Sequence, residues 1–397
     1  MHLAVYDFDQ LIDRKRTNSV KWGRDGHALT AEPRAADLLP MWVADMDFRV
    51  AAPILDALHE QIKIGVLGYD STPDSYREAV VAWQAQRFGW QARPEWLVQT
   101  PGVVSALNVA IQAFTQAGDH VLVQPPVYYH FLRDVICNDR RLALAPLPLS
   151  AGRYSFDPKA FEDAIEPGTK LFILCNPHNP TGNVWTREEL QTMAEICERH
   201  GILIVADEIH QDLVFGEGRR HLPLAMVNED IARNTIVCTA PSKTFNIAGL
   251  ACANIFIPDD RRRRSFRLQC ERNGMFLVNS MGTIACEAAY RHCASWVDAM
   301  LDYVRLNQRH FARRIKELGL PLTVTPTDAL YLAWIDCRAL GLRPTQLHDF
   351  MLRRARLWLE PGQKFGPAGE GFMRINLACP RRLVDDAIER LASALLG

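Results

Sequence analysis

The sequence lacks the patterns that would assign it to several common functional classes. Its ten cysteines form no CxxC pair, and no GxGxxG dinucleotide fingerprint, P-loop or HExxH zinc motif occurs. The formal net charge is −1, so no excess of one sign favours nucleic acid or an anionic membrane. The one dense basic run, residues 261–264, follows two aspartates and predicts a solvent-exposed helix start. We therefore expect no metal site and no nucleic-acid partner.

A long apolar run suited to a membrane span is also missing. The best candidate, residues 235–257, is interrupted by residues that are costly in lipid: Pro241, Ser242, Lys243, Asn246 and Asn254. The N-terminal stretch has acidic residues by position 7 and no apolar core, so we expect no secretory signal. The unpaired cysteines, several of them in apolar segments, are typical of reduced thiols. These features predict a cytoplasmic protein without a membrane partner.

Between about residues 95 and 257 the sequence alternates regularly between apolar runs and amphipathic stretches. Five short runs are typical of buried strands: 120–126, 170–177, 202–208, 235–240 and 252–257. Residues 186–201 predict a helix with a capping box formed by Thr186 and Glu189 and an end at Gly201. Continuous apolar strands separated by helices predict an α/β sheet with helices on both faces.

The C-terminal part has a different pattern. A long helical stretch at about 283–318 precedes short strands near 329–337 and 371–379, which predicts a smaller α+β domain. The Gly- and Pro-rich residues 360–371 predict a mobile surface loop. We therefore expect three parts: an N-terminal segment (1–50) that contributes to the small domain, a large domain (51–285) and a small domain (286–397).

Two cations lie in segments that are otherwise apolar. Burial lowers the pKa of an amine, so Lys243 could be a neutral nucleophile that forms a Schiff base with an aldehyde. The alternative is a lysine with a buried stem and an ammonium group that reaches water. Arg374, in GFMRINLAC, suits bidentate capture of a carboxylate, with a structural ion pair as the alternative.

Polar residues follow the predicted strands, where sheets of this kind bind ligands. Asp207 could be a metal ligand, a general base, a helix N-cap or the partner of a protonated pyridine nitrogen. His210 is either a donor to a ring oxygen or a core or surface histidine. NPHNPTG (176–182) has more turn residues than a plain surface turn requires, so Asn179 could offer its amide to a ring oxygen or a substrate carboxylate.

The remaining candidates fit a phosphate and an aromatic ring. The free N–H groups of Val103 and Val104, at the start of a predicted helix, suit a phosphate. Thr239 and Ser242 flank the lysine and either bind phosphate oxygens or act as caps. Tyr128 either stacks on an aromatic ligand or packs in the core. Taken one at a time, these signals are weak.

Four motifs in order resemble those of the fold-type-I pyridoxal-phosphate enzymes, the aspartate aminotransferase superfamily: NPHNPTG, ADEIH, SKTFNIAGL and GFMRINLACPR. The resemblance runs over nearly the whole chain. It implies a large domain with a mostly parallel seven-stranded sheet, a smaller α+β domain, and pyridoxal 5′-phosphate as cofactor. It also implies a homodimer in which Tyr69 of one subunit reaches the phosphate in the neighbouring site.

The resemblance implies a role for each candidate. Lys243 would form the Schiff base with the cofactor, and Asp207 would bond the pyridinium nitrogen. Asn179 and His210 would bond the phenolic oxygen, and Tyr128 would stack on the ring. The substrate carboxylate and the phosphate would be held by the others: Arg374 with Asn179 for the carboxylate, and Val103, Val104, Thr239 and Ser242 for the phosphate.

Within this superfamily, MWVADMDF (41–48) and ADEIHQDLVF are most similar to the MalY/PatB group of cystathionine β-lyases and cysteine-S-conjugate β-lyases. His210 stands where typical aminotransferases have tyrosine, and Ala251 where many have a phosphate-binding arginine. The group implies β-elimination from a sulfur amino acid, with release of a thiol, pyruvate and ammonia. An aminotransferase is the nearest alternative, and a regulatory protein that keeps the fold without catalysis is a more distant one. Lys364 leaves the preferred substrate side chain open.

Overall fold

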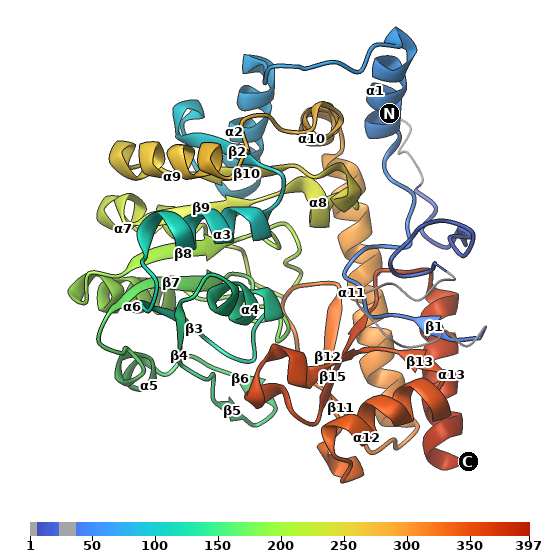
Figure 1. Ribbon diagram of the computed structural model, residues 1–397. Coiled ribbons are helices and arrows are strands. Elements are labelled where there is room, and N and C mark those ends of the chain that lie inside the picture. The colour runs from blue at the N-terminus through green and yellow to red at the C-terminus, as the bar shows by residue number, and fades with distance from the viewer. Residues whose placement is uncertain (1–5, 24–36) are drawn as a thin grey trace.

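The computed structural model describes residues 6–23 and 37–397. Its largest sheet has seven strands in the order β2-β10-β9-β8-β7-β3-β4 (Figure 1). All neighbouring pairs are parallel except the two pairs that involve β10, which runs against β2 and β9. The strands are β2 (Leu97–Thr100), β3 (His120–Val123), β4 (Arg141–Leu144), β7 (Thr169–Cys175), β8 (Leu203–Asp207), β9 (Thr235–Thr239) and β10 (Ala253–Phe256). The five predicted strands and the mostly parallel sheet are therefore confirmed.

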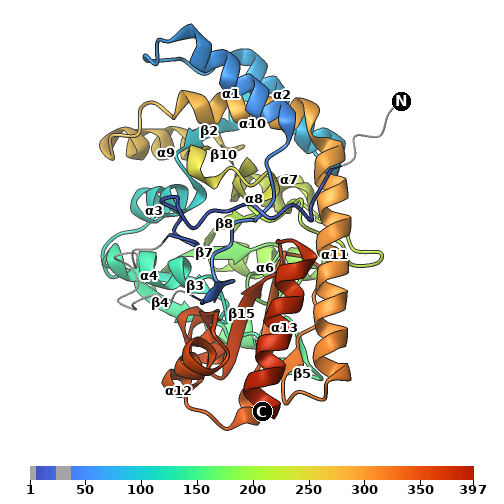
Figure 2. The ribbon, with the colours of Figure 1, turned by 90° about the vertical axis from the view of Figure 1, so that its right-hand side faces the viewer.

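Both faces of this sheet are buried, because alternate side chains of each strand enter different cores. In β8, Leu203 and Val205 pack into one cluster, whereas Ile204 and Ala206 pack into the other. The first cluster is covered by α3 (Val103–Phe114), α4 (Tyr129–Cys137) and α9 (Asp260–Arg272), and the second by α5 (Pro158–Asp163), α6 (Arg187–Arg199) and α7 (Glu229–Arg233). Figure 2 shows α3, α4 and α9 on one side of the sheet and α6 and α7 on the other.

Two helix starts agree with the sequence. The side chain of Thr186 accepts a bond from the Glu189 N–H and that of Glu189 from the Thr186 N–H, so the predicted capping box begins α6. Gly201, at φ +66°, follows the end of that helix in the left-handed conformation that glycine adopts at low cost. The basic run begins α9, whose N-cap Asp259 accepts a bond from the backbone of Arg262.

The predicted single helix at 283–318 is two helices. α10 (Ser280–His292) ends at Cys293, where the backbone leaves helical geometry, and α11 (Ala294–Glu317) begins beyond it. α10 packs on α1 (Ala52–Ile64) and α2 (Asp74–Phe88), beside the large sheet. α11 continues along one edge of the molecule to the smaller sheet and packs on α13 (Arg381–Leu396) (Figure 2). α11 itself contributes to two cores: Trp296 and Val304 pack in the same cluster as α10, and Phe311 packs in the core of the smaller sheet.

The smaller sheet has the order β11-β12-β15-β14, and its strands are β11 (Thr323–Val324), β12 (Leu332–Asp336), β15 (Phe372–Asn376) and β14 (Glu360–Pro361). It shares a core with α11, α12 (Pro344–Asp349) and α13. The N-terminal strand β1 (Leu39–Pro40) pairs with β13 (Leu357–Trp358), so the N-terminal segment lies against the C-terminal part. This pairing supports the expected three-part division, whose boundaries stay predictions.

Residues 360–371 do not form the surface loop that their composition predicts. They comprise β14 and two 3₁₀ turns, and Glu360, Gly362 and Phe365 are buried. A Cβ on Gly362 would lie 2.1 Å from the carbonyl oxygen of Gly369, so the glycines here permit close backbone approach. The composition therefore reflects tight packing of this segment against β15.

No helix within the described residues is long and apolar enough to cross a membrane. The ten cysteines are all unpaired, and nine of them are buried; Cys137 is exposed. The expectation that the cysteines form no disulfides and are mostly buried is thus confirmed.

Candidate active site

A cavity of about 330 Å³ lies at the carboxyl ends of the parallel strands. It brings together nine of the predicted site residues from six separate parts of the chain. These are Val103, Val104, Tyr128, Asn179, Asp207, His210, Ser242, Lys243 and Arg374. The cavity is therefore the site that the strand-end residues predict.

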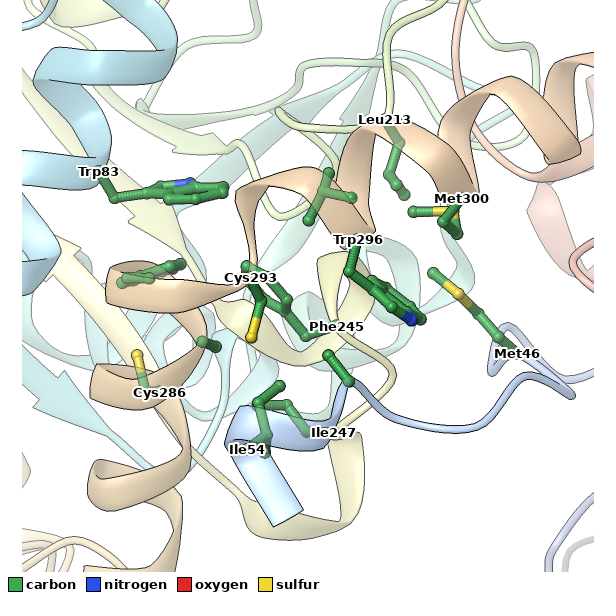
Figure 3. Packing of buried hydrophobic residues seen from close by; sticks show 14 of the residues in the cluster. Met46, Ile54, Trp83, Leu213, Phe245, Ile247, Cys286, Cys293, Trp296 and Met300 are labelled. Atoms are coloured by element: carbon green, nitrogen blue, oxygen red, sulfur yellow. The ribbon is translucent and has the colours of Figure 1, made fainter. Parts of the chain in front are cut away.

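Lys243 lies in α8 (Pro241–Thr244), directly after β9, and its Nζ donates to the backbone carbonyl of Ala44 at 2.7 Å. Burial lowers the pKa of the Lys243 amine to about 8. The two residues after Lys243 fix the position of its backbone. Thr244 donates to the buried carboxylate of Asp212, and Phe245 packs in the core. Figure 3 shows Phe245 and Ile247 among the side chains of α1, α10 and α11. A poorly solvated amine is thus held facing the cavity.

Asp207 and His210 place a buried carboxyl group and a buried imidazole beside that amine. Asp207 ends β8, its Oδ1 accepts from the N–H of Ile209 at 3.1 Å, and burial raises its pKa to about 7. Burial lowers the pKa of His210, and the Lys243 and Arg374 charges lower it further, so the imidazole is neutral. Its Nδ1 is buried without a hydrogen-bond partner among the described residues. Both groups gain from a bound ring that carries an N–H and a hydroxyl oxygen.

The N-terminus of α3 offers a phosphate site. Its N-cap, Gly102, has no side chain to satisfy the first N–H groups, so those of Val103 and Val104 face the cavity wall. Ser105 and Ser242 line the same wall. Ser105 escaped the sequence analysis, although its position in the first turn of a predicted helix is a usable signal. Ala251 also lines the cavity, so no arginine occupies that position.

Arg374 stands at the other side of the cavity on β15. Its side chain is 3% exposed, and it donates from Nη1 to Asn179 Oδ1 at 3.1 Å and from Nη2 to the Trp42 carbonyl at 3.0 Å. Nε has no partner within the described part of the chain. The guanidinium lies 5.0 Å from the ring centroid of Phe365, and burial lowers its pKa. A buried, aligned guanidinium of this kind suits a carboxylate.

Tyr128 lies at the N-cap of α4, and burial raises the pKa of its phenol well above the ordinary value, so the ring is neutral. It lines the cavity beside Tyr129, with ring centroids 4.8 Å apart. This position allows it to cover a flat ligand, as the resemblance implies.

The structure leaves two predicted residues outside the cavity lining. The Thr239 hydroxyl donates to the Asn254 carbonyl at 3.1 Å inside the sheet, so it is used between β9 and β10. Tyr69 is 93% exposed in the connection between α1 and α2, next to the exposed Val66 and Leu67. In this single chain it contacts no part of the cavity lining.

The segment 41–48 is the part of the site that chemistry-based reasoning missed. Trp42, Val43 and Ala44 line the cavity, and side chains from elsewhere hold their backbone. Asn376 donates to the carbonyls of Val43 and Asp45, both at 2.6 Å, and Tyr331 donates to that of Ala44 at 2.9 Å. The segment acts through backbone carbonyls, which explains why its side chains gave no chemical signal.

The four motifs imply pyridoxal 5′-phosphate, and the cavity fits it. Lys243 offers an amine for the aldehyde, Asp207 offers a buried carboxylate for the ring nitrogen, and His210 has an unsatisfied Nδ1 for a ring oxygen. The first turn of α3 offers N–H groups for the phosphate. By contrast, no group of three or more metal-ligating side chains occurs among residues 6–23 and 37–397.

Comparisons with known proteins agree with the geometry. The model of the family "aminotransferase class I and II" matches residues 53–391. Cystathionine beta-lyase PatB of Bacillus subtilis is 42% identical over 98% of this chain and 100% of the relative. Protein MalY of Escherichia coli is 30% identical over 98% of this chain and 99% of the relative.

Solved structures give the same result. The pyridoxal-phosphate-bound C–S lyase of Staphylococcus hominis is 30% identical, with a TM-score of 0.91 and full coverage of both chains. Cystalysin of Treponema denticola, which contains pyridoxal 5′-phosphate, is 32% identical, with a TM-score of 0.94 and 99% coverage of both chains. These likenesses confirm the fold type that the four motifs imply. The chain therefore belongs to the aminotransferase class I and II family.

Proposed function

We propose that this chain is a pyridoxal-phosphate-dependent carbon–sulfur β-lyase. Its substrate is an amino acid with a sulfur leaving group on Cβ, such as cystathionine or another cysteine S-conjugate, and its products are a thiol, pyruvate and ammonia. The observation that carries the proposal is the Lys243 amine, with a pKa of about 8, in a cavity that also holds Asp207 and Arg374. The names of the similar proteins support the lyase class.

Bound pyridoxal 5′-phosphate supplies an aldehyde for covalent attachment and a ring that accepts electrons from Cα. The residues present suit its retention. Asp207 would accept from the ring N–H, Asn179 and His210 would bond the ring oxygen, and Tyr128 would cover the ring. The first turn of α3, with Ser105 and Ser242, would hold the phosphate. The Thr239 hydroxyl already donates to the Asn254 carbonyl.

The protein residues then position the substrate and move a proton. Arg374, with Asn179, binds the α-carboxylate, which fixes the Cα–H bond relative to Lys243. The neutral amine of Lys243 takes the Cα proton. Cleavage of the Cβ–S bond releases the thiolate, and water converts the remaining three-carbon unit to pyruvate and ammonia. Lys243 is thus both the attachment point and the base.

The homodimer is part of the proposal. Tyr69 is 93% exposed at the tip of a connection whose neighbours Val66 and Leu67 are also exposed and apolar. Exposed apolar side chains grouped in this way are typical of an interface. Tyr69 would then reach the phosphate in the other subunit's site. The buried, unpaired thiols support a cytoplasmic location.

An aminotransferase is the rival, because it uses the same residues as far as removal of the Cα proton. Incubation with L-cystathionine in the absence of any keto acid separates the two. A lyase releases pyruvate continuously, whereas an aminotransferase stops after one turnover per site. The Lys243→Ala variant is the control, and it should be colourless and inactive. A requirement for added keto acid would establish the rival.

A further inference from the structure

One wall of the cavity carries a charged pair that the proposed reaction does not use. Glu360 on β14 lies directly opposite Arg374 on β15, and its side chain is 4% exposed and lines the cavity. Its Oε2 lies 3.9 Å from Arg374 Nη2. The Arg374 guanidinium already donates to Asn179 and Trp42, and it is reserved for the substrate α-carboxylate. Glu360 is therefore a second ionic group on the wall that faces the substrate.

Lys364 completes the pair four residues further on. Its Nζ lies 2.6 Å from Glu360 Oε1, and its side chain is 45% exposed. The ammonium lies 5.9 Å from the ring centroid of Trp42, which also lines the cavity. A carboxylate in the cavity lining and a partly exposed ammonium next to it thus lie beside Trp42.

This arrangement matches the chemistry of one class of substrate. A buried carboxylate is costly unless cations face it. Lys364 lies 2.6 Å from one oxygen of Glu360, whereas Arg374, at 3.9 Å, is beyond hydrogen-bond distance of the other. A thioether that carries a second amino acid on sulfur brings an ammonium and a carboxylate close together. A small S-alkyl cysteine brings neither group. The pair therefore offers a means of telling these substrates apart.

We propose that Glu360 and Lys364 are specificity-determining residues that bind the far end of the substrate. Glu360 accepts a hydrogen bond from the distal ammonium, and Lys364 pairs with the distal carboxylate. The enzyme accordingly prefers cysteine conjugates with a second ammonium–carboxylate end. The inference rests on the proposed lyase function, and it assigns the substrate class within that function.

The test measures kcat/KM by pyruvate release from the holoenzyme with a panel of four substrates. L-Cystathionine carries both distal charges, S-(2-aminoethyl)-L-cysteine only the ammonium, S-(carboxymethyl)-L-cysteine only the carboxylate, and S-methyl-L-cysteine neither. Glu360→Gln should lower the ratio of kcat/KM for the aminoethyl conjugate over the methyl conjugate by about tenfold or more, the effect of one charge-assisted hydrogen bond. Lys364→Met should instead lower the ratio of kcat/KM for the carboxymethyl conjugate over the methyl conjugate. Both variants should lower the ratio of kcat/KM for cystathionine over the methyl conjugate.

Lys159→Met is the matched control, because Lys159 forms an exposed i,i+4 pair with Asp163 away from the cavity. It should leave all ratios unchanged.

If Glu360 merely positions Arg374, Glu360→Gln lowers kcat/KM for all four substrates alike, and the proposal is overturned. Ratios within about twofold of wild type in both variants overturn it as well. Absence of pyruvate from every substrate with the wild-type enzyme would instead refute the lyase function. Lys364 is exposed, so its variant remains informative if Glu360→Gln fails to fold.

Discussion

The Nζ of Lys243 donates to the backbone carbonyl of Ala44, 199 residues away in the sequence, at 2.7 Å. This bond ties the proposed catalytic amine to the N-terminal segment that lines the cavity. The carbonyl replaces water as the partner of the amine, which keeps the group oriented while burial lowers its pKa to about 8.

Lys243→Met should abolish lyase activity and the visible colour of the holoenzyme, and it should stabilise the apoprotein. The amine titrates near 8 in the folded chain and near its ordinary 10.5 when unfolded. The unfolded chain therefore holds more protons between these values, and the free energy of unfolding rises with pH across this window. Methionine removes that rise, and below about pH 8 it also removes the cost of a poorly solvated ammonium. Urea unfolding of both apoproteins across this range is the measurement.

Asp207→Asn should show the opposite pH dependence. Its pKa of about 7 in the folded state exceeds the ordinary 3.8, so the folded apoprotein holds more protons between these values. Wild-type stability therefore falls as pH rises through this window, by up to about 4 kcal/mol, and the variant lacks this decline. The variant should also bind the cofactor weakly and lose most activity. An unchanged pH profile of apoprotein stability would contradict the burial of this carboxylate.

Arg374→Lys should raise KM for amino-acid substrates by about tenfold or more, because an ammonium cannot bond Asn179, Trp42 and a carboxylate in one plane. The kcat value should change less. Arg338→Lys is the control, since Arg338 pairs with Asp336 at 57% exposure on the outer side of the small sheet. Steady-state kinetics of pyruvate release provides the comparison.

Asp47→Asn should destabilise the chain by about 3 kcal/mol. Its carboxylate lies 2.6 Å from the Nζ of the buried Lys21 and 2.8 Å from Arg14, and it accepts from the Trp22 indole at 2.7 Å. Loss of that charge weakens the attachment of residues 14–22 to the segment that carries Ala44. Glu60→Gln breaks a fully solvated pair with Lys63 and should change stability by less than about 1 kcal/mol. Denaturant unfolding of both variants and the wild-type chain measures the two changes in the free energy of unfolding.

Tyr69→Ala should fold normally but bind the cofactor more weakly, because the side chain is 93% exposed within its own subunit. A mixture with Lys243→Ala tests where the tyrosine acts. In a mixed dimer one site combines an intact lysine with an intact partner tyrosine, so the mixture should regain about a quarter of wild-type activity. No recovery on mixing would show that Tyr69 does not complete a neighbouring site.

The sequence predicted those parts of the site that depend on side-chain chemistry after a buried strand. Asp207, His210 and Lys243 were found because parallel strands bring their carboxyl ends to one edge. For Thr239 the sequence leaves phosphate binding and capping open, and the resemblance favours the phosphate; in the structure its hydroxyl donates to the Asn254 carbonyl, so its phosphate role stays a prediction. Neighbours in sequence need not share a face.

Contacts made by the backbone were harder to predict. Ala44 and Trp42 contribute carbonyl oxygens, which every residue has, so residue type carries no signal. Residues 360–371 were misassigned because glycine and proline suit both mobile loops and close backbone packing, and only the neighbouring strand β15 decides between them. The break at Cys293 was hard to predict for another reason: buried residues on both sides of it, such as Tyr290 and Trp296, pack in one core, so the apolar pattern continues across it.

The bond between the Arg374 guanidinium and the Trp42 carbonyl joins positions 332 apart, near the two ends of a 397-residue chain. During synthesis the ribosome must release nearly the entire polypeptide before this wall of the cavity can close. All seven strands of the large sheet, and Lys243 with them, lie before position 257, so these residues leave the ribosome well before the guanidinium that receives a substrate. A chain that ended upstream of position 374 would lack this guanidinium, and it would also lack Asn376, which holds the backbone on both sides of Ala44.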